Sequence, residues 1–313
     1  MAHKTLIGGT AYEISGGKTL VNGTAYSIDK GKTLVGGTAY EVGFVSWPED
    51  LGTGLEFVSA SPFTMLVSSK GWNGTMEYCN GGEWQTWDGS EISSGKSDKG
   101  YCIYIRGTGN TKISPNSYRG NPVNMWTLTG SGINCNGNIE KLLDYATVAT
   151  GAHPTMADMC YYGLFYECTA LTSAPSLPAT TLTGNCYDSM FYGCTGLTSV
   201  PSLPATTLAY SCYNYMFNGC TGLTSVPSLP ATTLEQFCYR FMFRGCTKIK
   251  LSSTKTGTYT KAYRIPYSGT GTGSIDTSAT GGLYSMFSNT GGTFTGTPSA
   301  NTTYYLDSSN TIV

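Results

Sequence analysis

Apolar positions recur at a fixed spacing through the middle of the chain. Cys168, Cys194 and Cys220 each begin a 26-residue unit in which a leucine, a Pro-Ser-Leu-Pro-Ala-Thr-Thr-Leu run and a Met-Phe pair keep their places. A repeat of this length is typical of a solenoid, in which each unit buries its apolar residues against its neighbours. Solenoids mostly serve as recognition surfaces, so the pattern favours binding over catalysis.

A second repeat opens the chain. Lys4-Thr-Leu-Ile-Gly-Gly-Thr-Ala-Tyr12 recurs with small changes at Lys18 and Lys32. Each copy holds two β-rich runs separated by Gly-Gly or Asn-Gly, and this predicts a tight β-hairpin. Because small hairpins cannot enclose a core alone, we expect residues 1–43 to dock on copies of themselves or on another protein. A flexible repetitive leader is the alternative.

Alternating apolar and polar positions predict a compact β-sandwich over residues 44–137. The predicted strands are 55–58, 63–67, 75–78, 83–87, 101–105 and 125–128. Trp84 and Trp87 are three positions apart, so both cannot face one side of a regular strand. We expect one of them in the core and the other exposed, where it could stack on a sugar.

A short helix is predicted to follow this region. Asn138 is a suitable N-cap, and Ile139, Leu142, Leu143 and Ala146 have the spacing of one helix face. Such a helix would cover the apolar end of the repeats. After Cys246 the repeat decays, with an echo of its Met-Phe step in the segment 283–287.

Composition narrows the function classes. Only 12% of residues are charged, about half the usual share, and the net charge is −1. We therefore expect no nucleic-acid partner and no electrostatic attraction to membranes. The apolar runs are shorter than the roughly 20 residues of a membrane helix, so no membrane insertion is expected. The residues after Met1 lack the apolar run of a secretory signal. A virion component made in the cytosol, or a mature protein cut from a secreted precursor, would fit this pattern.

Eight of the 11 cysteines follow the repeat period. They form two rows, Cys160, Cys186, Cys212 and Cys238, and Cys168, Cys194, Cys220 and Cys246. The favoured interpretation is that small buried thiols fill the interior. Stacked disulfides are the alternative, which requires Cα atoms within roughly 7 Å. No closely spaced cysteine pair is present, so no metal site is predicted.

Candidate catalytic residues are scarce. His3 and His153 are the only histidines, which leaves little material for a histidine-based triad or metal cluster. We predict a protein that is not an enzyme and that needs no cofactor. A carboxylate pair such as Glu77 and Glu83 keeps glycoside hydrolysis as an alternative, because such pairs come together only in the fold.

A few positions differ between the otherwise near-identical units. One position carries Asp188, Asn214 and Arg240, another carries Tyr192, Asn218 and Arg244. Drift at solvent-facing sites is one explanation, and a contact surface rich in Tyr, Asn and Arg is the other. The predicted ligand-binding residues are Tyr192, Tyr210, Asn214, Tyr215, Arg240, Arg244 and, for stacking on a sugar, Trp87.

The repeats resemble the BspA-like leucine-rich-repeat family of host-associated bacteria. The resemblance rests on Phe191-Tyr-Gly-Cys194-Thr-Gly-Leu197-Thr-Ser-Val200-Pro201 and on its copy at 217–227. That family usually has Ala at the positions of Cys186, Cys212 and Cys238, and its period is commonly shorter. Residues 105–112 and 138–145 are similar to segments that precede such repeats in gut bacterial proteins and their phages, and the N-terminal units resemble repeats of phage structural proteins. These resemblances imply a leucine-rich-repeat fold and an adhesive function.

We therefore predict a mainly β protein in four parts: β-hairpin repeats (1–43), a β-sandwich (44–137), a leucine-rich-repeat solenoid with short helical turns (138–250), and a degenerate repeat with a C-terminal cap (251–313). The predicted function is that of a homo-oligomeric phage virion component, a fibre-like or capsid-decoration protein. It would dock on other virion proteins through residues 1–43 and bind a bacterial surface or glycan through the solenoid. The alternatives are an adhesin at the bacterial cell surface and a structural spacer without a ligand.

Overall fold

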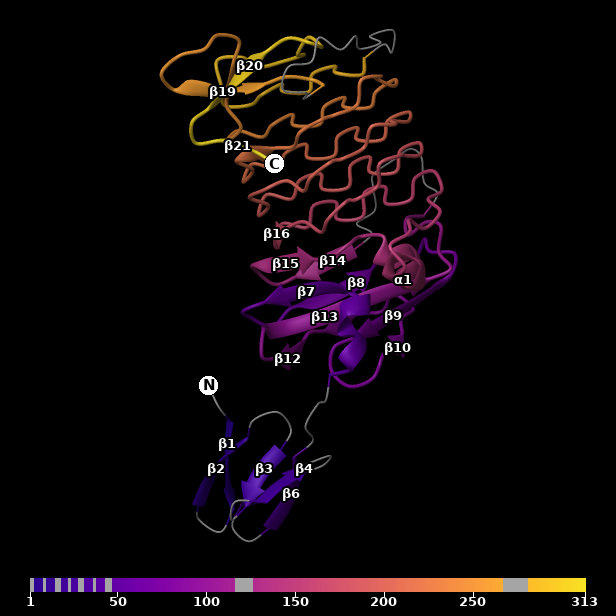
Figure 1. Ribbon diagram of the computed structural model, residues 1–313, viewed down its shortest axis with the longest axis vertical. Helices are drawn as coiled ribbons and strands as arrows, with labels where there is room; N and C mark the ends of the chain where they lie inside the picture. The colour runs from indigo at the N-terminus through magenta and orange to yellow at the C-terminus, as the bar shows by residue number, and fades with distance from the viewer. Residues whose placement is uncertain are drawn as a thin grey trace. The chain divides into compact units, whose positions relative to one another are not determined.

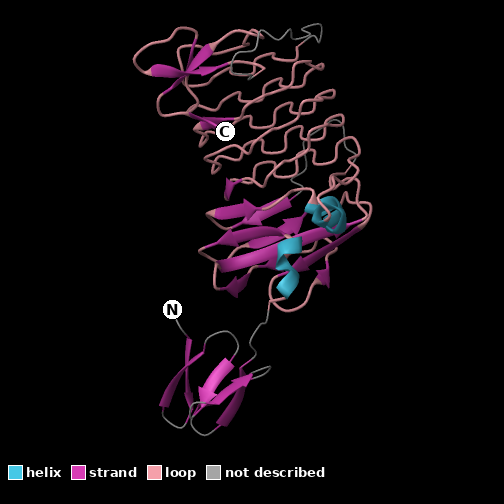
Figure 2. Cartoon of the chain, in the orientation of Figure 1, coloured by secondary structure: helices cyan, strands magenta, loops and turns pink. Residues whose placement is uncertain are grey.

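The computed structural model describes residues 47–115, 126–266 and 281–313, and the backbone of six strands within the first 46 residues. The protein is mainly β, as predicted. The chain divides into two compact units, Met1–Trp47 and Pro48–Val313 (Figures 1 and 2). Each unit is taken by itself below.

The first unit consists of three antiparallel hairpins. They are β1 (His3–Ile7) with β2 (Thr10–Ile14), β3 (Lys18–Val21) with β4 (Thr24–Ser27), and β5 (Gly31–Val35) with β6 (Thr38–Val42). This confirms the three predicted hairpins, while their Gly-Gly and Asn-Gly turns lie outside the described residues. The hairpins contact one another, β2 with β3 and β1 with β5.

The second unit begins with a short 3-10 helix, η1 (Glu49–Thr53), and two sheets. The larger sheet has the order β10-β9-β13-β7-β15-β16, with β12 paired beside β13. Its strands are β7 (Leu55–Ser59), β9 (Thr75–Cys79), β10 (Gln85–Thr86), β12 (Gly95–Ser97), β13 (Gly100–Thr108), β15 (Ile133–Asn136) and β16 (Leu171–Ser173). The smaller sheet contains β11 (Ile92–Ser93), β8 (Thr64–Val67) and β14 (Trp126–Thr129) in that order. All six predicted strands occur, the fourth shortened to two residues.

One apolar core joins both sheets to the first repeat. Phe57 of β7 lies 6.0 Å from the ring of Trp126 of β14 and 6.2 Å from Phe165, between ring centroids. The strand β16 pairs in parallel with β15. The repeats therefore grow directly from the edge of the larger sheet, and aromatic packing at this junction fixes where they start.

The predicted helix is present but begins two residues later and is less regular. It is α1 (Lys141–Ala149), and it packs against β13. Leu142 and Leu143 are buried as predicted, whereas Ala146 is exposed, which corrects its assignment to the apolar face. The reason is Asp144, whose φ of −154° and ψ of 99° break the helical periodicity between the two leucines and Ala146. Asn138 accepts a hydrogen bond from the amide of Glu140 just before the helix.

From residue 159 onward the chain forms successive turns that contain few regular strands (Figure 1). Five segments correspond to one another and are called the ladder segments: 159–168, 185–194, 211–220, 237–246 and 281–290. In each of the first four, every second amide donates to a carbonyl of the next ladder segment, as Tyr187 does to Cys212 at 3.0 Å and Phe191 does to Met216 at 2.9 Å. The amides between them bond three residues back within their own segment, as Met190 does to Tyr187.

The backbone of the ladder segments takes a left-handed conformation at every fourth residue. In the second ladder segment these residues are Asn185, Ser189 and Gly193, with φ of 54°, 55° and 68°. The amides of the left-handed residues donate to the next segment, as Ser189 does to Asn214 and Gly193 does to Asn218. Side chains at equivalent positions consequently fall into rows.

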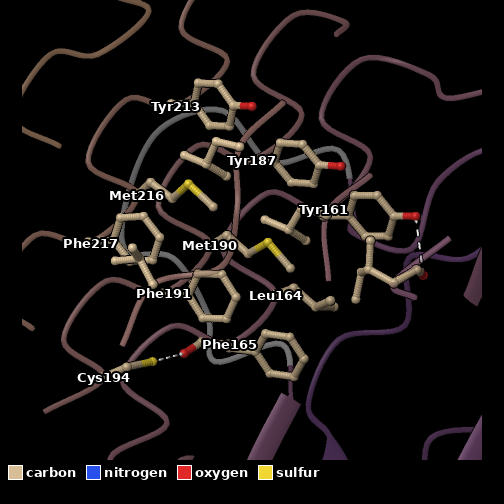
Figure 3. Close-up of a cluster of buried hydrophobic side chains, with 14 of the residues drawn as sticks. Tyr161, Leu164, Phe165, Tyr187, Met190, Phe191, Cys194, Tyr213, Met216 and Phe217 are labelled. Carbon is tan, nitrogen blue, oxygen red and sulfur yellow. Dashed lines mark hydrogen bonds between the residues drawn. The ribbon is translucent and has the colours of Figure 1, made fainter. Parts of the chain in front are cut away.

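The inward rows are aromatic, and they fill the core (Figure 3). The rings of Phe165, Phe191 and Phe217 stack at centroid distances of 5.5 Å. The row continues to Phe243 and Phe287, at 5.6 and 5.5 Å. A parallel row of stacked tyrosines contains Tyr161, Tyr187, Tyr213 and Tyr239, and methionines lie between the two rows. Phe287 shows that the echo at 283–287 joins the same row.

All eleven cysteines are buried free thiols. The Sγ of Cys194 donates to the carbonyl of Phe165 at 2.9 Å, and Cys220 and Cys246 make the same contact to Phe191 and Phe217. Each thiol therefore satisfies a carbonyl of an earlier ladder segment. Burial raises the pKa of Cys194 and Cys220 well above the ordinary value, which keeps these thiols protonated and unreactive.

The C-terminal region closes the second unit with small sheets. One sheet has the order β18 (Leu251–Ser252), β20 (Tyr304–Asp307), β19 (Tyr259–Tyr263). The other pairs β17 (Ser225–Val226) in parallel with β21 (Thr311–Ile312). The chain end thus returns to an earlier repeat and covers it.

Replacement of one ring of the phenylalanine row should destabilise the whole second unit. Phe217 is fully buried between Phe191 and Phe243. We expect Phe217→Ala to lower the free energy of unfolding by about 3–5 kcal/mol, because it leaves a cavity and interrupts the stacking. Urea unfolding of the full chain measures this, with Thr221→Ala at a nearby exposed position as the control. Equal stability of the two variants would contradict the packing described here.

Candidate binding face

The residues that differ between repeats gather around a continuous aromatic and arginine surface on the ladder segments. We call it the aromatic–arginine face. It comprises Tyr166, Tyr192, Tyr210, Tyr215, Phe237, Arg240, Phe241, Arg244 and Tyr284. Tyr284 is 52% exposed and Tyr210 is 40% exposed, and Arg244 is exposed as well. The other six residues of the face are half-buried, in contrast to the fully buried inward rows.

Aromatic rings follow one another across the turns of this face. Tyr166 and Tyr192 stack with centroids 4.6 Å apart, and Tyr192 lies 6.3 Å from Tyr215. Tyr215 then contacts Phe241 at 4.6 Å, and Phe241 contacts Tyr284 at 5.4 Å. Neighbouring ladder segments thus each contribute one ring to an unbroken strip.

Two arginines lie on the strip. The guanidinium carbon of Arg240 is 4.9 Å from the ring centroid of Phe237 and 4.7 Å from that of Phe241. The guanidinium of Arg244 lies 5.3 Å from Phe241. Stacking of this kind holds a guanidinium by its flat face. The four ion pairs of the described residues involve neither arginine.

Three rings of the face sit on strained backbone. Tyr215, Phe237 and Phe241 have φ of 53°, 61° and 56°, the left-handed region that costs a side-chain-bearing residue roughly 1–2 kcal/mol. Tyr215 and Phe241 occupy the same position of the repeat. The equivalent position in the first ladder segment is Gly163, and in the second and fifth it is Ser189 and Ser285. Small residues thus suffice for the turn itself. Bulky aromatic residues at a position where glycine fits better indicate a role in function.

A buried carboxylate lies beside the face. Asp188 Oδ1 accepts a hydrogen bond from Ser189 Oγ at 2.7 Å, and Oδ2 accepts one from Asn214 Nδ2 at 2.9 Å. Burial raises the pKa of Asp188 to about 6, against the opposing effect of these bonds and of the charge on Arg240. The position occupied by Asp188, Asn214 and Arg240 thus changes from acidic to basic along the repeats.

Six of the seven predicted ligand-binding residues lie on or beside this face. Tyr192, Tyr210, Tyr215, Arg240 and Arg244 belong to it, and Asn214 lies beside it, bonded to Asp188. Four of its aromatic residues, Tyr166, Phe237, Phe241 and Tyr284, were not predicted. Three of them could have been found from their position in the repeat, since Tyr166, Phe241 and Tyr284 are equivalent to Tyr192, Tyr215 and Arg240.

The prediction that Trp87 binds a ligand is wrong. It is 1% exposed, and its ring packs 5.4 Å from Trp126 and 5.7 Å from Trp72. The buried core therefore excludes it from stacking on a sugar. Trp84 is the more accessible of the pair, but it is covered on one side by the guanidinium of Arg106 at 4.0 Å.

Other polar groups are engaged elsewhere in the fold. Glu77 accepts a hydrogen bond from Arg106 at 2.8 Å, and Glu83 is exposed. The ring Nδ1 of His153 lies 2.9 Å from both carboxylate oxygens of Glu140, at the edge of a cavity of about 290 Å³. Within the described residues, no three metal-ligating side chains come together. In the same residues, the chain forms no helix with the length and apolarity to cross a membrane.

Comparison of the chain with known protein-family models, with curated proteins and with solved structures found no match. Function is therefore inferred from the aromatic–arginine face.

The buried carboxylate predicts a pH-dependent stability. The folded-state pKa of Asp188 is about 6, above its ordinary value of 3.8, so the folded protein binds this proton more tightly than the unfolded chain. The resulting stabilisation is present below about pH 4 and is lost as the pH rises through about 6. We expect the free energy of unfolding of Asp188→Asn to exceed that of the wild type by up to about 2 kcal/mol at pH 8 and to equal it at pH 4. Urea unfolding at the two pH values measures this difference. An equal advantage at both pH values would contradict the buried carboxylate.

Proposed function

We propose that the ladder segments are the turns of a leucine-rich-repeat solenoid and that the protein is a non-enzymatic adhesion protein. The aromatic–arginine face is its recognition surface. The observation that carries the proposal is the placement of Tyr215 and Phe241 on left-handed backbone, since the fold itself is served by Gly163 and Ser189 at the same position.

The ligand class that this surface supports best is a surface glycan. Sugar rings present C–H groups that pack on the faces of aromatic rings, and tyrosine adds a hydroxyl at the edge. Tyr166 and Tyr192 cover each other's faces, since their planes are 5° apart, and they present ring edges and hydroxyl groups to a ligand. Tyr210 and Tyr284 are the most exposed rings, and they would pack on sugar rings by their faces.

The proposed setting is a phage virion, in which residues 1–43 dock on other virion proteins and the repeats contact the bacterial surface. Support for this setting comes from the N-terminal units, three copies of one hairpin that resemble repeats of phage structural proteins. An adhesin at the bacterial cell surface would use the same face. A structural spacer would not bind through it at all.

Glycine substitution separates binding from folding. We expect the double variant Tyr215→Gly/Phe241→Gly to lose glycan binding by at least tenfold, because two rings of the strip disappear. Its stability should fall by less than the loss of two ring contacts alone would cause, since glycine adopts the left-handed backbone at both sites without strain. Binding of the full chain to an array of immobilised bacterial and host glycans measures the first effect, and thermal unfolding measures the second.

Ser285→Gly is the matched control, because it makes the same backbone change at the equivalent position without removing a ring. Unchanged glycan binding by the double variant would refute the assignment of the face. Failure of the wild type to bind any glycan on the array would leave the spacer interpretation.

A further inference from the structure

We propose that the aromatic–arginine face selects acidic glycans, whose carboxylate groups pair with Arg240 and Arg244. This inference rests on the proposed function and names the ligand class of the same site. Neither arginine takes part in the ion pairs of the described residues, although both lie on the accessible side of the repeats.

Aromatic rings surround the guanidinium of Arg240. Phe237 and Phe241 lie 4.9 and 4.7 Å from its central carbon, and Tyr284 lies at 6.0 Å. Its Nε is buried and has no hydrogen-bond partner within the described residues, so a bound carboxylate would meet the two terminal nitrogens. The group is therefore held by rings without being neutralised, the state that favours a bidentate carboxylate.

The two positive charges lie close to one aromatic ring. Arg244 lies 5.3 Å from the ring of Phe241, the same ring that supports Arg240. The two like charges thus share one aromatic support at a cost in mutual repulsion. A bound carboxylate would remove that repulsion, which adds to the affinity for an anion. A neutral glycan would gain the stacking alone.

The charge at one position changes along the repeats. The position that carries Arg240 carries Asp188 two ladder segments earlier, and that carboxylate is buried and accepts hydrogen bonds from Ser189 and Asn214. Because Asp188 makes these bonds with neutral side chains and no ion pair with either arginine, the charges of Arg240 and Arg244 favour an acidic ligand at their part of the strip.

The test compares acidic glycans with their own neutral derivatives. The full chain is applied to an array that holds bacterial and host glycans with uronic or sialic acids, each next to its carboxyl-reduced form, and neutral glycans. We expect binding to acidic members, a loss of at least tenfold on carboxyl reduction, and a similar loss in Arg240→Gln/Arg244→Gln. Increasing salt should weaken binding of the wild type more than binding of this variant.

The matched control is Lys96→Gln/Lys255→Gln, which removes two exposed positive charges outside the face. It should bind acidic glycans as the wild type does. Equal binding to acidic and carboxyl-reduced members, lost only in Tyr215→Gly/Phe241→Gly, would overturn the acidic preference and leave the proposed glycan function intact. No binding to any member would overturn both, and equal loss in both charge variants would reduce the effect to net charge.

Discussion

Hydrogen bonds between neighbouring ladder segments are the interaction on which the rest of this structure depends. Every second amide of a segment reaches a carbonyl of the next one, so a segment that lacks its neighbour leaves a line of amides without protein partners. This requirement fixes the register of the repeats. Once the register is fixed, identical positions must stack, and the phenylalanine and tyrosine rows follow with centroid spacings of 5.5 to 5.8 Å. Buried thiols then satisfy carbonyls of earlier segments, from Phe165 to Phe217.

The same register produces the candidate site. A residue on the outer side of one ladder segment lies next to its equivalent on the following segment, as Tyr166 does to Tyr192 and Tyr215 does to Phe241. The contact of Tyr192 with Tyr215 joins these two pairs into one strip. Substitution at such a position changes the surface without changing the ladder, because the amides of the backbone make the bonds. The protein can therefore keep identical core residues while the position of Asp188, Asn214 and Arg240 changes its charge. This separation of scaffold and surface explains why the variable residues gather on one strip.

Periodicity alone predicted the strands, the hairpins and the rows of the repeats, because each depends on spacing along the chain. It failed where long-range packing decides. Ala146 has the spacing of the apolar helix face, but Asp144 interrupts the helix before it. Trp87 has a ring that can stack on a sugar, but it lies in the core. The left-handed backbone at Tyr215 and Phe241 was not predictable, because both residues disfavour it locally and only the bonds to neighbouring segments impose it. Phe287 follows Phe243 by 44 residues instead of 26 and still stacks on it. A fixed period of 26 residues therefore does not predict the position of the last ladder segment.

Hydrogen exchange of individual amides, followed by NMR on the full chain, tests this account most directly. The amides of Tyr187, Phe191, Tyr213 and Phe217 donate to the next ladder segment and should be among the slowest in the protein. Amides of exposed linking residues such as Thr232 should exchange much faster. Exchange of the four ladder amides as fast as that of Thr232 would show that the segments are not bonded to one another, and would contradict both the fold and the face built on it.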